Sequence, residues 1–276
     1  MFAALLITWR EGLEAALIVG IILSALRHLG KDKAKRRVWW GVLAAIVTSM
    51  VGAAALTTLG LTFEGRGEEI FEGVAMLVAA GVLTWMIIWM QRQGSQTQAR
   101  LKADVRAASA TGSRWALFSL AFVAVVREGI ETTLFLTAAA MNTTAAQTLV
   151  GGALGLSIAI ILGWMIFVAG SHLNVKAFFR VTSVLLLFFA ASLAAHGIHE
   201  FQEAALLPTF VEHMWDLNPI LDESGTLGSL LAALFGYNGN PSLLESVVYG
   251  IYLLIVGLLT QRRRPEAAQV AQLSTS

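Results

Sequence analysis

The stretch LITWREGLEAALIVGIILSAL, residues 6–26, is apolar almost throughout but carries three charged residues, Arg10, Glu11 and Glu14, in its first half. A second apolar stretch contains REGIETTLF, residues 127–135, in which the same three charges recur. Charged side chains are costly inside a helix that lies in lipid. An Arg-Glu-x-x-Glu motif that occurs twice in such segments therefore predicts an internal repeat and a function for the charges.

The composition indicates the class of protein. Hydrophobic residues make up 57% of the 276 residues and charged residues only 13%, and several apolar runs reach the ~18 to 20 residues that cross a bilayer. These values exclude a soluble domain and make the lipid bilayer the expected surrounding, with no nucleic-acid partner. No cysteine is present, which excludes disulfides and thiolate metal sites. We expect the N-terminal segment to be a first span rather than a removable signal peptide.

A window of about 20 residues identifies seven apolar segments that we expect to be transmembrane helices. They lie at 2–26, 38–60, 70–90, 115–140, 148–170, 178–195 and 244–260. Most of the 19 Lys and Arg residues follow the first, third, fifth and seventh segments, whereas the other connections are mainly acidic. Because cytoplasmic loops are enriched in Lys and Arg, the N-terminus is expected outside and the C-terminus inside. The predicted fold is an all-α integral membrane protein with seven transmembrane helices.

The spacing of the two motifs predicts how the chain is organised. An offset of 117 residues places the first segment on the fourth and also the second on the fifth, while the third segments fit it loosely. The two copies have opposite topology, so they form a 3+3 inverted repeat, which places transport sites near the bilayer midplane. The expected divisions are a first repeat, a cytoplasmic linker, a second inverted repeat, a periplasmic loop, a seventh helix and a cytoplasmic tail, at 1–91, 92–114, 115–198, 199–243, 244–261 and 262–276.

The motif charges are expected to form one site. At ~1.5 Å per residue they lie roughly 12 to 18 Å into a hydrocarbon core about 30 Å thick, and within each copy they project into one arc of about 100°. Two arginines can keep some carboxylates ionised, but four glutamates leave two negative charges. Carboxylate oxygens without sulfur suit a hard cation. The predicted metal ligands are Glu11, Glu14, Glu128 and Glu131, supported by Arg10 and Arg127.

Two further features bear on this site. We expect Gly12 and Gly129, which lie inside the motifs, to let the two motif helices approach closely. The simpler alternative is that two buried Arg–Glu pairs only fix helix packing. That alternative would not need a second glutamate in each copy.

A second group of polar residues is expected at the outer surface. The sequence EEIFEG begins the third segment, and HGIHEFQEA follows the sixth with its polar residues spaced along one helical face. Imidazole and carboxylate groups together can collect a transition metal before it enters, although polar helix ends are also common at an interface. The candidates for this outer site are Glu68, Glu69, Glu72, His196, His199, Glu200 and Glu203.

Three features of the sequence resemble the high-affinity iron permease family, of the oxidase-dependent iron transporter type, in its bacterial branch. They are the paired Arg-Glu-x-x-Glu motifs, the ExxE sequence of Glu69 and Glu72, and the closing LFGY and PS before the last helix. The resemblance covers essentially the whole chain. It implies uptake of iron ions across the bacterial inner membrane, with the four motif glutamates as translocating ligands. It also implies a periplasmic iron-binding protein and a haem peroxidase as partners.

The sequence therefore predicts an iron permease and not an enzyme, with iron as the substrate and no permanent cofactor. Alternatives from other classes are a carrier for another divalent metal such as Mn or Zn, a membrane-embedded metalloenzyme built on His196 and Glu200, and a structural or receptor component of an uptake complex. Four carboxylates favour Fe³⁺, whereas two histidines at the entrance favour Fe²⁺, so the oxidation state stays open. No GxxxxGK[ST] sequence is present, which leaves an ion gradient, the membrane potential or redox trapping as the energy source.

Overall fold

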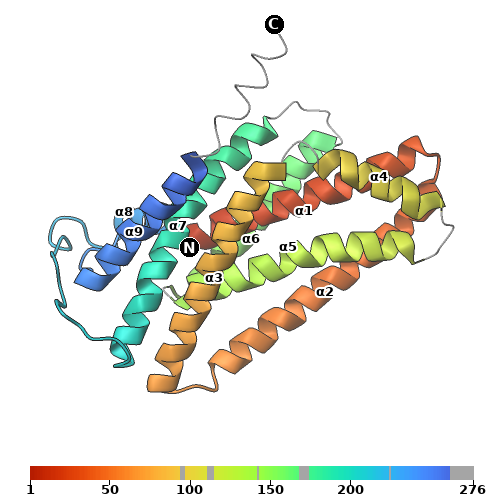
Figure 1. Ribbon diagram of the computed structural model, residues 1–276. Coiled ribbons are helices and arrows are strands. Elements are labelled where there is room, and N and C mark those ends of the chain that lie inside the picture. The colour runs from red at the N-terminus through yellow and green to blue at the C-terminus, as the bar shows by residue number, and fades with distance from the viewer. Residues whose placement is uncertain (94–96, 111–114, 142, 168–173, 224, 262–276) are drawn as a thin grey trace, which may run out of the picture. The chain divides into compact units, whose positions relative to one another are not determined.

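The structure, a computed structural model, describes residues 1–93, 97–110, 115–141, 143–167, 174–223 and 225–261 (Figure 1). Regular structure in these residues is α-helical, apart from the short 3₁₀ turn Asp32–Ala34. The helices are α1 Phe2–His28, α2 Lys35–Gly60, α3 Arg66–Gln93, α4 Thr97–Ala110, α5 Ala116–Met141, α6 Ala145–Phe167, α7 Val175–Glu203, α8 Thr226–Phe235 and α9 Leu243–Gln261. The predicted all-α class is confirmed.

Each of the seven predicted segments corresponds to a helix, namely α1, α2, α3, α5, α6, α7 and α9. The largest difference in bounds is at α7, which continues to Glu203 and so includes the histidines and glutamates of the HGIHEFQEA sequence. Two more helices, α4 and α8, lie in the predicted cytoplasmic linker and in the predicted periplasmic loop. The predicted tail at 262–276 lies outside the described residues.

Several helices are suited to a membrane. By length and composition, Asp32–Gly60, Arg66–Met90, Ala145–Phe167 and Ala177–Glu203 could each cross one. The motif helices α1 and α5 have comparable lengths, 27 and 26 residues, but each carries the three motif charges. The exposed faces of α2 and α6 are apolar, with Met50 and Trp164 more than half exposed. Large exposed apolar surfaces of this kind fit an integral membrane protein.

The chain forms two compact units. Unit 1 comprises Met1–Glu68 and Arg92–Ser183, and thus contains α1, α2, α4, α5 and α6. Unit 2 comprises Glu69–Gln91 and the chain from Val184 onward, and thus contains most of α3 and α7 together with α8 and α9. Each unit takes helices from both predicted repeats.

Unit 1 has an internal symmetry, which the neighbours of two glycines show. A Cβ added to Gly41 of α2 would lie 3.1 Å from the Cβ of Ala121 in α5. A Cβ added to Gly151 of α6 would lie 3.1 Å from the Cβ of Ala4 in α1. Ala4 and Ala121 are 117 residues apart, as the two motifs are. The α2–α5 contact therefore repeats the α1–α6 contact, with residues from both copies in each pair.

The same contacts correct the predicted offset for the second helices. Gly41 and Gly151 are 110 residues apart, not 117, so the prediction for this part of the repeat was wrong by two helical turns. Two differences in length account for the shift. Beyond its motif, α1 continues to His28, which is a longer extension than that of α5 to Met141. The connection from α1 to α2 is also longer than the connection from α5 to α6.

The motif glycines also have neighbours other than those expected. A Cβ on Gly12 would lie 2.9 Å from the Cβ of Ala159 in α6, and one on Gly129 would lie 2.7 Å from the Cβ of Ser49 in α2. The glycines therefore permit close packing of α1 on α6 and of α5 on α2, rather than of α1 on α5. The expectation that they bring the motif helices together was wrong, because the helix face that carries the glycine differs from the face that carries the charges.

The two motif helices, α1 and α5, are antiparallel. Ile22 and Leu26 near the end of α1 share a buried apolar cluster with Leu117 and Ala121 near the start of α5. Further along, Glu14 of α1 forms an ion pair with α5. Residue numbers therefore increase along α1 in the direction in which they decrease along α5. The two helices are antiparallel where the motifs meet.

Unit 2 is built on a close approach of α3 and α7. A Cβ on Gly73 would lie 2.9 Å from the carbonyl oxygen of Gly197, and one on Gly197 would lie 3.0 Å from that of Gly73. α9 joins α3 through a hydrogen bond of 2.5 Å between Thr84 Oγ1 and Tyr252 Oη. α8 ends at Gly236, whose φ of 69° is a left-handed conformation that glycine adopts without strain. This residue is the glycine of the LFGY sequence.

Candidate metal centre

The charged motif residues are buried in unit 1. Arg10 and Glu11 of α1 are fully buried, and Glu128 and Glu131 of α5 are 2% and 6% exposed. Charged residues are almost never fully buried unless they have partners of opposite charge or a bound ion. Their burial from two antiparallel helices confirms that the two motif copies meet in one place.

Three of the glutamates converge. Carboxylate oxygens of Glu11, Glu128 and Glu131 all lie within 4.8 Å of one another, which is a spacing that one bound cation can bridge. Within the described residues, this is the group of three or more His, Asp or Glu side chains close enough to hold a metal ion. The group takes one carboxylate from the first motif and two from the second.

The two arginines lie beside the carboxylates. Arg10 forms a close ion pair with Glu11, and its Nη2 lies 3.7 Å from Glu14 Oε2. Arg127 donates a hydrogen bond of 3.1 Å from Nε to Glu131 Oε1 and lies 3.4 Å from Glu128 Oε1. A guanidinium group presents several donors in a fixed plane and can therefore serve two carboxylates at once. Each arginine serves the two glutamates of its own motif.

Glu14 occupies a different position from the other three glutamates. Its carboxylate lies between the two guanidinium groups, 3.7 Å from Arg10 Nη2 and 4.0 Å from Arg127 Nη2. It is also the most accessible of the four, with a side chain that is 15% exposed. Glu14 therefore links the two motifs and is not a member of the converging group.

Several carboxylate oxygens lack a hydrogen-bond donor. Among the described residues, no donor within hydrogen-bond geometry reaches five buried oxygens: Glu11 Oε2, Glu14 Oε2, Glu128 Oε1, Glu128 Oε2 and Glu131 Oε2. A buried polar atom left without a partner costs ~1 to 3 kcal/mol, and more where the group is charged. Coordination to a cation would satisfy these oxygens, and oxygen-only coordination suits a hard or borderline metal ion. The centre is thus chemically a carboxylate site for a cation.

Sequence reasoning missed an aromatic neighbour of this centre. The Phe179 ring of α7 lies with its centroid 5.9 Å from Arg10 Cζ, within the range of a cation–π interaction. The adjacent Phe178 packs on Trp9, with ring centroids 4.9 Å apart. The pair FF at the start of the sixth predicted segment was the available signal, but apolar pairs are common in membrane helices.

Among the described residues of unit 2, the outer candidates do not form a group of three ligand atoms close enough to hold one ion. Glu68 lies in unit 1 and is exposed, whereas Glu69, Glu72, His196, His199, Glu200 and Glu203 lie in unit 2. Glu69 and Glu72 lie in the first turns of α3, and Glu200 and Glu203 lie in the last turn of α7. His196 points its Nδ1 back to the carbonyl oxygen of Ser192, at 3.0 Å.

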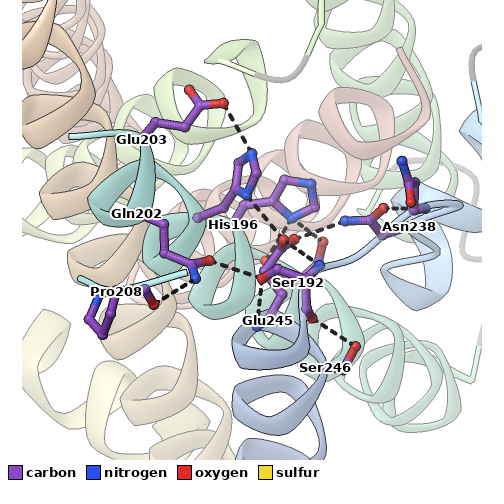
Figure 2. A network of polar contacts seen from close by, with 11 residues as sticks. Ser192, His196, Gln202, Glu203, Pro208, Asn238, Glu245 and Ser246 are labelled. Carbon is purple, nitrogen blue, oxygen red and sulfur yellow. Dashed lines mark hydrogen bonds and ion pairs between the residues drawn. The ribbon is translucent and has the colours of Figure 1, made fainter. Parts of the chain in front are cut away.

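His199 is held between two carboxylates. Its Nε2 lies 3.2 Å from Glu203 Oε1, and its Nδ1 lies 3.1 Å from Glu245 Oε1. Either nitrogen could bind a metal only after it released its present partner. Figure 2 shows Glu203 at the upper edge of the network of polar contacts and Glu245 near its centre.

Glu245 is a residue that sequence reasoning missed. It is 3% exposed, accepts a hydrogen bond of 2.9 Å from Asn238 Nδ2, and accepts another of 3.0 Å from the backbone N–H of Ser242 (Figure 2). Ser242 Oγ in turn accepts a bond from the backbone N–H of Glu245. This is a capping box, and its signature S-x-x-E is visible in the sequence SLLE at the start of α9.

Comparison with known proteins agrees with the geometry of the buried centre. Residues 1–262 match the iron permease FTR1 family. The chain belongs to this family. Similar proteins include the ferrous iron permease EfeU of Shigella sonnei (strain Ss046) and that of Escherichia coli O157:H7, each 38% identical over 99% of this chain and 100% of the relative.

A ferrous iron permease EfeU of Yersinia pestis is also 38% identical, over 92% of this chain and 91% of the relative. No solved structure shows a significant match to the chain. The resemblance predicted from the motifs is thereby confirmed at the level of the family. Membership supports iron transport as the function, and the membrane-suited helices support a multi-pass membrane protein.

Proposed function

We propose that this protein imports iron ions across the bacterial inner membrane and that Glu11, Glu14, Glu128 and Glu131 carry the ion through it. The observation that supports this most is the convergence of three buried carboxylates from two antiparallel helices, with oxygens that lack hydrogen-bond donors. A site that only fixed helix packing would pair each of its oxygens, since unpaired buried charge is destabilising.

The proposal includes the arrangement in the membrane. Seven helices, α1, α2, α3, α5, α6, α7 and α9, cross it, with the N-terminus outside and the C-terminus inside. In this arrangement the carboxylates of α1 and α5 would lie within the bilayer, between two copies of opposite orientation. Iron would first meet the acidic and histidine side chains at the outer ends of α3 and α7, then the buried carboxylates, and would leave on the cytoplasmic side.

The oxidation state and the partners belong to the proposal as well. The relatives are named ferrous iron permeases, which supports Fe²⁺ as the transported ion. Carboxylate oxygens also bind Fe³⁺ and Mn²⁺, so the centre alone does not discriminate between these ions. A periplasmic iron-binding protein and a haem peroxidase are proposed partners that would deliver the ion in the required state.

Transport by the purified protein tests the proposal. Wild-type protein in liposomes is expected to take up Fe²⁺ under reductant, whereas Glu11→Gln, Glu128→Gln and Glu131→Gln are expected to fall to the level of protein-free liposomes. Glutamine keeps the size of the side chain but removes the charge that binds the cation. Glu64→Gln, at an exposed position after α2, is the matched control and should transport normally.

Three outcomes would contradict parts of the proposal. Uptake of chelated Fe³⁺ in preference to Fe²⁺ would overturn the assignment of the oxidation state. Stronger competition by Mn²⁺ than by unlabelled Fe²⁺ would indicate that the protein is a manganese carrier. Normal uptake by all three glutamine variants would show that the buried centre does not carry the ion.

A further inference from the structure

One face of α1 leads away from the carboxylates. Leu17, Ile21 and Ser24 follow Glu14 at intervals of three or four residues, so they lie on the same side of the helix and successively nearer to its end. Glu14 is the most accessible of the four motif glutamates. This face therefore connects the accessible edge of the centre with the end of α1, which is followed by the basic segment that begins at Lys31.

A cavity opens along this face. It has a volume of about 240 Å³, and Leu17, Ile21 and Ser24 form one wall. The others are formed by Ile166 and Phe167 at the end of α6, Lys102 of α4 and Val175 at the start of α7. The cavity is large enough to hold several water molecules. It begins less than one helical turn beyond Glu14, and none of the described residues that line it carries a carboxylate that would retain a cation.

The ring of Phe167 closes the wall of the cavity against α1. It packs so tightly on Gly20 that a Cβ at this position would collide with three of its ring carbons. The internal symmetry of unit 1 relates the contact between Phe167 and Gly20 to a second pair of positions, where no aromatic residue is present. With the offsets of 117 for α1 and 110 for α6, the equivalent residues are Thr137 for Gly20 and Thr57 for Phe167. An aromatic ring is therefore present on one side of the carboxylates, and small hydroxyl side chains stand in the equivalent positions on the other.

We propose that this cavity is the exit chamber for iron on the cytoplasmic side and that Phe167 is its gate. The inference rests on the proposed function and adds the direction of release to it. The ring of Phe167 stands on the cytoplasmic side, whereas the equivalent position on the other side carries only the small side chain of Thr57. The structure is therefore a state that is closed toward the cytoplasm. Release requires the ring to leave Gly20, which opens the face of α1 between Glu14 and Ser24.

The chemistry of the chamber fits a passage rather than a binding site. Its walls are mainly apolar, and apolar constrictions close channels by excluding water. Lys102 contributes a positive charge, which disfavours residence of a cation and so favours its onward movement. A cation is thus bound at the carboxylates and released through walls that do not hold it.

The natural lack of cysteine makes a direct test available. Ser24→Cys protein in liposomes is expected to react with a membrane-impermeant methanethiosulfonate reagent trapped on the cytoplasmic side, and to lose iron uptake once it has reacted. Ser157→Cys is the control, because Ser157 is an exposed residue of α6 that does not line the cavity. It should keep its uptake whether or not it reacts.

A second arm does not depend on transport. In Leu17→Cys protein, the additional change Phe167→Ala should raise the rate of cysteine modification from the cytoplasmic side several-fold, whereas Phe167→Leu should raise it less. The proposal fails if Ser24→Cys is modified without loss of uptake, if it is never modified, or if Phe167→Ala leaves the rate at Leu17→Cys unchanged. Absence of uptake by unmodified wild-type protein would instead contradict the proposed function.

Discussion

The Glu14 carboxylate of α1 lies 4.0 Å from the Arg127 guanidinium of α5, so an ion pair joins the two copies of the motif. Within single copies of the motif, Arg10 pairs with Glu11, and Arg127 pairs with Glu128 and Glu131. Glu14 also contacts Arg10. Movement of one motif helix against the other would therefore change the ion pairs of Glu14.

The arginines are expected to tolerate lysine poorly. An ammonium group is a point charge and cannot hold two carboxylates with the planar geometry of a guanidinium. Arg127→Lys should weaken iron binding by about 10- to 100-fold, as changes to residues that orient metal ligands commonly do. Titration of the purified variant with Fe²⁺ under reductant measures this. Binding of wild-type strength would show that guanidinium geometry is not required.

Arg10→Lys should have a larger effect on folding than Arg127→Lys. Arg10 is fully buried, whereas the Arg127 side chain is 36% exposed. Replacement of Arg10 leaves Glu11 with an incomplete partner in an apolar surrounding, which is strongly destabilising. Thermal unfolding of the two variants in the same detergent compares them. Equal melting temperatures would show that the greater burial of Arg10 does not make its replacement more destabilising.

The symmetric glycine contacts should be sensitive to a single methyl group. Gly41→Ala and Gly151→Ala would each force neighbouring backbone apart in unit 1, with a cost of about 1 to 3 kcal/mol. Gly52→Ala is the control, because nothing lies within 4 Å of the added Cβ, and alanine is favoured over glycine in a helix by up to about 1 kcal/mol. The prediction is wrong if all three variants unfold at the same temperature.

Glu245 should stabilise the start of α9. Glu245→Ala removes the capping box and the contact with His199, and loss of the cap alone costs ~0.5 to 2 kcal/mol. Amide hydrogen exchange in the first turn of α9 should therefore accelerate. Glu203→Gln is the control, since its side chain is 55% exposed and such pairs contribute ~1 kcal/mol or less. Equal exchange in both variants would argue against a role for the cap.

The proposed orientation can be tested with single cysteines. Glu64→Cys lies in the connection after α2 and Lys33→Cys in the connection after α1, and both positions are exposed. An impermeant maleimide added outside intact spheroplasts should label the first and not the second. The reverse pattern would invert the topology.

The sequence was sufficient for seven of the helices and for the charged residues of the centre. Apolar runs of the right length predicted seven helices, and the repeated motif identified the buried glutamates, because charge inside an apolar segment has few explanations. The offset of the second helices was missed, since α1 and the connection after it are longer than their counterparts. Helix periodicity also could not show that Gly12 faces Ala159, because the choice of neighbouring helix depends on packing between distant segments.

The position of Glu14 could likewise not be predicted. Glu14 and Glu131 are equivalent in sequence, yet Glu131 joins the converging carboxylates and Glu14 lies between the arginines. Side-chain rotamers in a crowded centre decide between these positions, and a motif does not encode them. The same is true of Glu245, which reaches His199 only through the folded loop before α9.

X-ray absorption at the iron edge of the iron-loaded protein would show whether iron binds at the buried carboxylates. The spectrum is predicted to show oxygen ligands without the multiple-scattering signature of imidazole. Glu11→Gln and Glu128→Gln, one change in each motif, should each lower the number of bound oxygens or abolish binding, whereas His199→Gln should leave the spectrum unchanged. A spectrum with imidazole ligands that both glutamine variants retain would contradict a binding site made of carboxylates from the two motifs.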